Sequence, residues 1–201
     1  KAQPDNVQIF IRMANIAFMM ENYGAMATAC EKAILLDSEN ATAHYLYAEA
    51  CKGQGDDVNT IAMATKAISI DNKQGNAYLL RGETYLRTQQ LSEAEADADW
   101  LLEHTEDNED VLLLKARIER AANRNDEAIE YFTKAIDANP FSYTAFKERS
   151  EMYSLVGNEA KAKEDAERAE ELMPTDGKEN AEENIEKQLN DKYKQMNPYG
   201  F

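Results

Sequence analysis

One residue position recurs along this chain every 34 residues, and this spacing limits the possible folds more than any other feature. An alanine occupies the position in four places and a leucine in the fifth. In chain order these residues are Ala33, Ala67, Leu101, Ala135 and Ala169. A fixed period of this length is typical of repeat proteins, in which each unit buries its apolar side only against its neighbours.

The apolar side chains inside each unit have the spacing of two short helices. In the third unit, one stripe is formed by Tyr78, Gly82 and Tyr85, and a second by Ala94 and Ala98. Both stripes recur at intervals of three or four residues, which is the period of an α-helix. Short polar segments that would form the turns between the two helices lie at 53–57, 87–92, 123–126 and 156–159.

Small residues stand where the two helices of a unit would cross. Gly82, Ala116 and Ser150 share the eighth position of their units, and alanines share the twentieth in the last three units. Two helices approach to about 8–10 Å only where the facing side chains are small. The sequence therefore predicts an all-α fold, a right-handed α-solenoid of five 34-residue helix-turn-helix repeats followed by a capping helix.

These motifs resemble the tetratricopeptide repeat family. The segment NDEAIEYFTKAIDANP in the fourth unit is very close to the family consensus, and Tyr78, Gly82 and Tyr85 match its first helix. The resemblance covers residues 7–174 in unbroken register. The usual alanine is replaced at three places, by Met26, Thr60 and Leu101. The resemblance implies a scaffold that binds other proteins and catalyses nothing itself.

The register divides the chain into a lead at 1–6, repeats, a capping helix at 175–196 and a tail at 197–201. The capping helix is expected because one apolar stripe runs along it, formed by Ala181, Ile185, Leu189 and Tyr193. A helix with one apolar stripe and a charged back suits the end of a solenoid. The five repeats between the lead and the cap are expected at 7–40, 41–74, 75–108, 109–142 and 143–174.

Charge argues against two classes of partner. The chain has 22 Lys and Arg residues against 38 Asp and Glu residues, a formal net charge of −16 at pH 7. Such a charge repels phosphate backbones and anionic lipid. No apolar run reaches the roughly 18 residues that a membrane-spanning helix requires. We therefore expect neither nucleic acid nor a membrane as partner.

No group of residues indicates catalysis, a cofactor or a metal site. The two histidines, His44 and His104, have no serine or cysteine partner at a recognisable spacing. His44 falls at a packing position, and His104 falls near a helix end, where an imidazolium favours the helix dipole. The acidic stretches 93–99 and 106–110 do not match a calcium loop and are interpreted as a solvated helix face and a turn.

Two cysteines, Cys30 and Cys51, fall at interior positions of successive units. Buried free thiols are the expected state, and a disulfide between the two units is the alternative. Free thiols slightly favour the cytoplasm over a bacterial periplasm or secretion. The sequence begins with Lys1, so it does not reveal whether a signal peptide lies upstream.

The resemblance also implies a concave surface lined by the first helix of each unit, with positions 2, 5, 6, 9, 12 and 13 facing inward. Leucines are frequent there, although positions 4, 8 and 11 already supply the packing within each helix pair. Apolar surface that packing does not need commonly marks a binding site. The alternative is that a neighbouring unit or the capping helix covers these leucines.

We predict that this groove binds a helical or extended apolar peptide of a partner protein, with three arginines orienting acidic groups of the ligand. The basic clamp with which some family members grip chaperone C-termini is absent, since only Asn15 matches it. The predicted groove residues are Tyr45, Leu46, Glu49, Leu79, Leu80, Glu83, Leu86, Arg87, Leu113, Leu114, Arg117 and Arg120.

The first helix differs from the others because it is apolar on nearly every side. Ile9 and Ile16 hold positions 3 and 10, which in later units would face the preceding helix pair. A helix of this kind is usually covered, either by an upstream helix or by a second chain in a homodimer through residues 7–20. The alternative function is therefore structural self-association, through this helix or through the tail at 197–201.

Overall fold

The computed structural model describes residues 4–105 and 108–173, and within these ranges the chain folds into ten helices without a strand. In chain order the helices are α1 (Pro4–Met19), α2 (Tyr23–Leu36), α3 (Ala41–Gly53), α4 (Asp57–Ile70), α5 (Gly75–Arg87), α6 (Leu91–His104), α7 (Glu109–Ala121), α8 (Asn125–Ala138), α9 (Tyr143–Leu155) and α10 (Glu159–Leu172). The prediction of an all-α fold is confirmed. The predicted capping helix at 175–196 and the tail at 197–201 lie outside the described residues.

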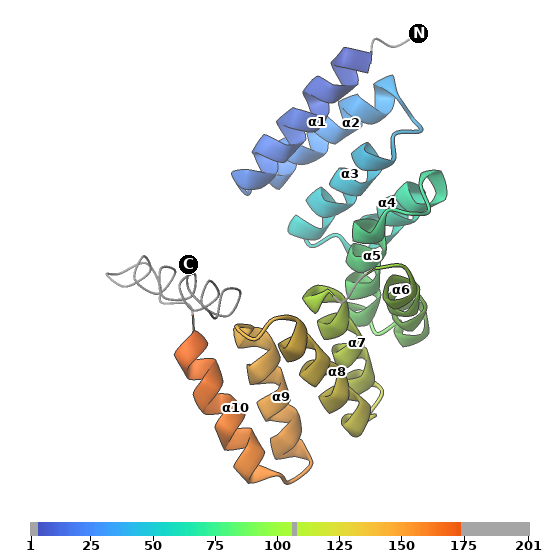
Figure 1. Cartoon of the computed structure of the whole chain (residues 1–201). Coiled ribbons are helices and arrows are strands. Elements are labelled where there is room, and N and C mark those ends of the chain that lie inside the picture. The colour runs from blue at the N-terminus through green and yellow to red at the C-terminus, as the bar shows by residue number, and fades with distance from the viewer. Residues whose placement is uncertain (1–3, 106–107, 174–201) are drawn as a thin grey trace, which may run out of the picture.

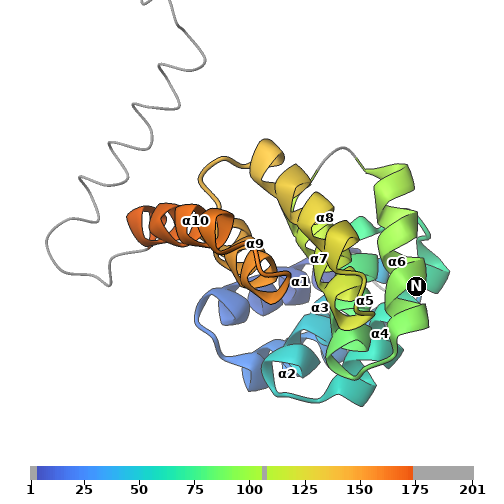
Figure 2. The same cartoon turned by 90° about the horizontal axis from the view of Figure 1, so that it is seen from below.

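Consecutive helices form pairs that stack into an open arc (Figure 1). When the molecule is seen from below, successive helix pairs are rotated relative to one another (Figure 2). The first helices of the pairs also contact one another in sequence, from α1 to α3, α5 and α7. Because the first helices approach one another in this way, they form the inner side of the curve. The predicted solenoid of five helix pairs is confirmed.

The helices begin close to the residues at which the 34-residue register places them. Ala41, Gly75, Glu109 and Tyr143 are both the first residues of predicted units and the first residues of α3, α5, α7 and α9. The first unit differs, because α1 begins at Pro4, three residues before its predicted start. Part of the predicted lead at 1–6 is therefore helical.

The turn within each pair contains a residue in the left-handed region of backbone conformation. All five of these residues hold position 15 of their units. Gly55 and Gly157 have φ of +75° and +78°, as expected for residues that lack a Cβ. Non-glycine residues take the same conformation in the other three turns, namely Glu21, Gln89 and Asn123.

Small side chains allow the helices to cross closely, as the sequence predicts. The alanines at position 20, such as Ala94 and Ala128, are fully buried. A Cβ added at Gly82 would lie 3.0 Å from Cδ2 of Leu114 and 3.3 Å from Cβ of Asp97. The larger residues at alanine positions are also accommodated, because Met26, Thr60 and Leu101 are almost completely buried.

One polar contact is repeated at every junction between the described units. The residue at position 7 binds the residue at position 25 of the preceding unit, sixteen residues earlier. The pairs are Tyr47 with Glu31 (3.0 Å), Arg81 with Thr65 (3.0 Å), Lys115 with Asp99 (2.7 Å) and Arg149 with Thr133 (3.1 Å). The junctions are therefore joined by hydrogen bonds and ion pairs as well as by apolar packing.

The two arginines among these position-7 residues also bind an aspartate on the second helix of their own unit. Arg81 donates two hydrogen bonds to the carboxylate of Asp97, at 2.6 and 2.9 Å. Arg149 binds Asp165 in the same way, with both distances 2.7 Å. Both carboxylates are buried, so each arginine neutralises a charge inside the helix stack.

Candidate functional site

A cavity of about 310 Å³ opens on the inner side of the arc, between the C-terminal halves of α3, α5 and α7. Its lining includes the half-buried Leu86 together with Leu114 and Thr84, each only 1% exposed, and the other lining residues are charged. The lining residues are Lys52, Glu83, Thr84, Leu86, Arg87, Leu114 and Arg117. Five of the twelve predicted groove residues are among them, and Lys52 and Thr84 are additional.

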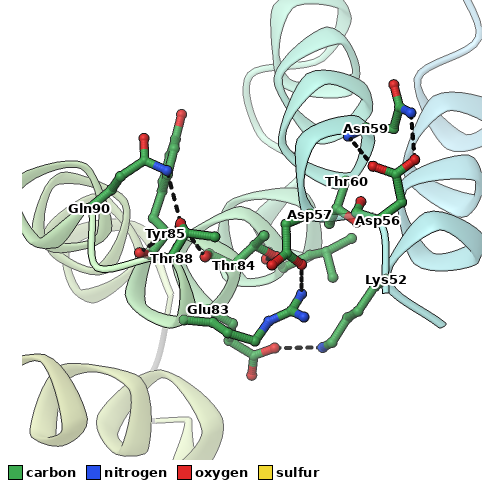
Figure 3. Close-up of polar contacts among 12 residues, drawn as sticks. Lys52, Asp56, Asp57, Asn59, Thr60, Glu83, Thr84, Tyr85, Thr88 and Gln90 are labelled. Atoms are coloured by element: carbon green, nitrogen blue, oxygen red, sulfur yellow. Dashed lines mark hydrogen bonds and ion pairs between the residues drawn. The ribbon is translucent and has the colours of Figure 1, made fainter. Parts of the chain in front are cut away.

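Ion pairs connect the helices around this cavity. The Lys52 ammonium reaches from α3 to the Glu83 carboxylate on α5, with Nζ 2.7 Å from Oε2 (Figure 3). Arg87, on the same helix as Glu83, pairs with Asp57 at the start of α4. In each of these two pairs the cation, Lys52 or Arg87, is more exposed than its carboxylate partner. They therefore remain accessible to a ligand.

The arginines further along the arc are also paired with carboxylates of this chain. Arg117 donates three hydrogen bonds to Glu148, at 2.5–3.0 Å. Hydrogen bonding to this carboxylate raises the pKa of Arg117, against the effect of its burial. Arg120 lies 3.4 Å from Glu148 and 3.5 Å from Glu151. Two of the three arginines predicted to orient a ligand, Arg117 and Arg120, thus already have partners on α9.

Four of the predicted groove leucines are core residues, so the prediction that they form exposed surface is wrong. Leu46, Leu80, Leu113 and Leu114 are only 8%, 2%, 5% and 1% exposed. Leu80 packs with Ala48 of the preceding unit. Leu114 packs against Gly82, where a Cβ would lie 3.0 Å from its Cδ2 atom. At these positions neighbouring units cover the leucines, which was the alternative to an exposed binding surface.

The other apolar groove residues are only half-buried. Leu79 and Leu86 keep part of their surface on the inner side. Tyr45 is also half-buried, and its hydroxyl donates a hydrogen bond to Glu49 at 2.8 Å. Burial and the nearby Glu49 raise the pKa of Tyr45. The inner face is therefore more polar than the sequence predicts, with limited apolar surface between charged side chains.

The histidines and cysteines occupy structural positions. His44 is buried, with Nε2 3.0 Å from the Ser38 carbonyl oxygen. His104 stacks on Trp100 at 4.4 Å at the end of α6. Cys30 and Cys51 are buried free thiols. Burial raises the pKa of Cys30 to about 12, with smaller effects of Cys51 and Glu31.

The described helices carry neither a metal-binding cluster nor a membrane span. Within 4–105 and 108–173, no three His, Cys, Asp or Glu side chains are arranged to hold an ion. Likewise, none of the helices in these ranges combines the length and the hydropathy needed to cross a bilayer. The acidic stretch at 93–99 lies on α6, and part of the stretch at 106–110 falls in the undescribed gap.

Comparison with known proteins places this geometry among helical repeats. A family model described as tetratricopeptide repeat matches residues 79–143. No curated protein matches the sequence. Solved structures match more of the chain, among them the MamA fragment named "41-end" from Desulfovibrio magneticus RS-1. That structure shares 14% identity, covers 85% of this chain and 97% of its own, and has a TM-score of 0.76.

Two further structures are similar at somewhat higher identity. A tetratricopeptide repeat protein from Parabacteroides merdae ATCC 43184 is 21% identical and covers 87% of this chain and 68% of its own, with a TM-score of 0.75. YrrB, described as a TPR protein with an unusual peptide-binding site, is also 21% identical. It covers 83% of this chain and 86% of its own, with a TM-score of 0.66. The family model thus shows tetratricopeptide repeats at residues 79–143, and the solved structures share the fold of stacked helix pairs over most of the chain.

Proposed function

We propose that this protein is a non-catalytic scaffold that holds a segment of a partner protein on the inner face of its arc. The observation that supports the proposal is the 310 Å³ cavity between α3, α5 and α7, which combines apolar surface with three cationic side chains. Concave sites of this kind, with a few polar groups around an apolar floor, are typical of ligand-binding surfaces. YrrB, which has a similar fold, is described as having an unusual peptide-binding site, and by analogy we expect a peptide ligand here.

The charge of the inner face suggests the chemistry of the ligand. At the inward positions of the five units, six cations stand beside five carboxylates, although the whole chain has 22 cations and 38 carboxylates. These residues are Arg12, Lys52, Arg87, Arg117, Arg120 and Lys147, with Glu49, Glu83, Asp110, Glu148 and Glu151. An acidic ligand therefore meets less repulsion here than on the remaining surface.

The ion pairs around the cavity provide a means of recognition. A carboxylate of the ligand can replace Glu83 beside Lys52 or Asp57 beside Arg87, because both pairs are partly exposed. Exposed ion pairs contribute only about 0–1 kcal/mol, so the exchange is not costly. Leu86 would contact an adjacent apolar side chain of the ligand. We expect a short segment that alternates acidic and apolar residues, with affinity on the order of micromolar because ordering a flexible peptide offsets much of the contact energy.

Selection from a displayed peptide library tests this proposal. The protein should enrich segments with acidic and apolar residues, and a selected peptide should bind more weakly at higher salt. The variant Lys52→Glu/Arg87→Glu should lose the peptide while retaining its helical circular dichroism. Lys66→Glu is the matched control, since Lys66 pairs with Glu39 at the surface but does not line the cavity. Equal binding by both variants would refute the groove assignment.

Self-association is a second candidate function, favoured by one specific observation. Large apolar side chains of α1 are exposed on the side that faces away from the stack, among them Ile9 and Ile16. Contiguous apolar surface on a folded protein commonly marks an interaction site. Sedimentation over a concentration series, with and without residues 1–20 or 197–201, distinguishes association through α1 from association through the tail.

A further inference from the structure

The outer side of α1 carries an unbroken row of exposed apolar residues. Ile9, Met13 and Ile16 are 52%, 49% and 57% exposed, and Met20, directly after the helix, is 72% exposed. Their spacings of four, three and four residues place them on one side of the helix. At 1.5 Å per residue, the row is about 17 Å long. We call these four residues the α1 stripe.

The same side of the first helix is covered in every later unit. Ile9 and Ile16 hold positions 3 and 10, and the eight counterparts of these residues are at most 4% exposed. Position 7, which lies between them, bonds to the preceding unit at each junction. The buried counterparts are Ala43, Ala50, Ala77, Thr84, Val111, Ile118, Ala145 and Met152.

The stripe therefore has the register of a docking surface, and at position 3 it carries a larger side chain than its counterparts. Isoleucine replaces alanine at position 3 in comparison with three of the four later units. Longer side chains extend the reach of the helix, which suits contact with a helix that is not held by a tight turn. The row of alternating three- and four-residue spacings is also the pattern with which two helices pack side by side.

We infer that two copies of this chain pair through the α1 stripe, with α1 against α1 across a two-fold axis, into a closed dimer. This inference rests on the self-association candidate described above. Identical apolar stripes are complementary to each other when a two-fold axis relates them. Arg12 is the only charged residue from Asn6 to Met20, so two chains of net charge −16 approach here with little local repulsion.

The opposite end of the described solenoid is unsuited to α1, which argues against head-to-tail stacking. Nine of the fourteen residues of α10 are charged. A cavity of about 550 Å³ beside α9 and α10 is lined mainly by charged side chains: Phe146, Arg149, Tyr153, Lys161, Glu164, Asp165, Glu167, Arg168 and Glu171. Burying these groups against Ile9 and Ile16 would leave charges without water or partners, which is unfavourable. An interface of α1 with α1 across a two-fold axis is complete with two chains, whereas a head-to-tail interface continues to add chains.

A closed dimer would carry two inner faces in one particle. A partner with two matching segments, or an assembly that repeats one segment, would then be held at both sites. Linked sites raise the apparent affinity well above that of one site when the geometry allows both to engage. The weak single-site binding expected for the groove would be sufficient under those conditions.

Sedimentation velocity of the full chain over a wide concentration series tests the inference. We expect a monomer–dimer equilibrium without larger species. Ile16→Glu places a charge in the interface twice, and it should weaken the dimer at least about a hundredfold. Leu35→Glu is the matched control, because Leu35 lies on α2 outside the stripe and is already exposed. Its dimer should be unchanged, and both variants should keep the helical circular dichroism of the parent chain.

The possible failures of this test are distinguishable. A folded chain that stays monomeric at every concentration overturns self-association itself. Association that continues beyond the dimer, or a dimer that Ile16→Glu leaves intact, overturns the α1 pairing while self-association stands. A monomeric chain that dimerises only after removal of residues 174–201 shows that this segment covers the stripe, and it also overturns the inference.

Discussion

At the scale of single residues, Gly53 shows how closely two units approach. A Cβ added at this last residue of α3 would lie 2.3–2.4 Å from three ring atoms of Tyr23 on α2. Gly53→Ala should therefore lower the free energy of unfolding by about 1–3 kcal/mol, because the ring must move. Urea unfolding measures the change. Gly24→Ala is the control: its nearest neighbour would be 3.8 Å away, and alanine there should be neutral or stabilising.

The Cys30 thiol predicts how stability depends on alkaline pH. Burial raises its pKa from 9.0 to about 12 in the folded chain. Above pH 9 the thiol of the unfolded chain loses its proton while the folded chain keeps it. The unfolded state then binds fewer protons, so the free energy of unfolding falls as pH rises from about 9 to 12. Cys30→Ala should make this decline shallower in unfolding series, and an unchanged slope would contradict the assignment.

The groove leucines show which properties of a residue its register reveals. The 34-residue period correctly placed Leu46, Leu80 and Leu114 at one recurring position of the first helices. It did not reveal that neighbouring first helices approach closely enough to bury all three. Burial depends on the distance between units, which in turn depends on small residues such as Gly82 in another stripe. A pattern within one unit does not contain that distance.

At the scale of elements, the turns within the helix pairs all need a residue with positive φ, and they use either glycine or another residue for it. Position 15 is left-handed in all five turns, but only Gly55 and Gly157 are glycines. A non-glycine residue in this conformation costs roughly 1 kcal/mol. Gln89→Gly should therefore raise the free energy of unfolding by about 0.5 kcal/mol, after part of the gain is lost to the greater freedom of glycine in the unfolded chain.

Thermal or urea unfolding of this variant provides the measurement, with a second substitution as comparison. Asn123→Gly should have a smaller effect, because asparagine tolerates the left-handed region better than glutamine does. Destabilisation by Gln89→Gly would show that the side chain contributes more than the strain removes. The sequence predicted turns at 87–92 and 123–126, but it did not indicate that Gln89 and Asn123 are left-handed there, since Glu21, Gln89 and Asn123 have no common side-chain chemistry.

The buried pair of Arg81 and Asp97 should be one of the stronger polar contacts between α5 and α6. Their side chains are 15% and 5% exposed, and two hydrogen bonds join them. Asp97→Ala leaves the guanidinium without its main partner, so we expect a loss of about 3 kcal/mol. The surface pair of Lys66 and Glu39 is the matched control, and Lys66→Ala should change stability by less than about 1 kcal/mol.

A double-mutant cycle isolates this interaction from the packing of the two side chains. The coupling between Arg81→Ala and Asp97→Ala should be large and favourable, and a coupling near zero would contradict a direct role. The sequence held a signal for this contact, because Arg149 and Asp165 repeat it 68 residues later. A search for apolar stripes does not detect it, since the repeated residues are charged and only alternate units carry them.

At the scale of the whole molecule, the architecture was predictable because it is local. Each unit contacts mainly the next, so a period read from the sequence determines the order of packing. The shape of the ligand site was less predictable, because the cavity is formed by three units together. Lys52 holds an inward position in its own unit, but its contact at the site is with Glu83 of the following unit, which a pattern within one unit does not contain.

This local architecture predicts that stability varies along the arc. An end unit has a neighbour on one side only, so it should open more readily than a middle unit. Of the two described ends, the last pair should be the weaker, because α9 buries only Ala145 and Met152, whereas α1 buries Val7, Ile11, Ala14 and Ala17. Amide hydrogen exchange should therefore be fastest in α9 and α10 and slowest in α5 and α7. Pairing of two chains through α1 would slow exchange in α1 and α2, and Ile16→Glu should remove that protection. Uniform exchange along the chain would instead show that all five units unfold as one cooperative body.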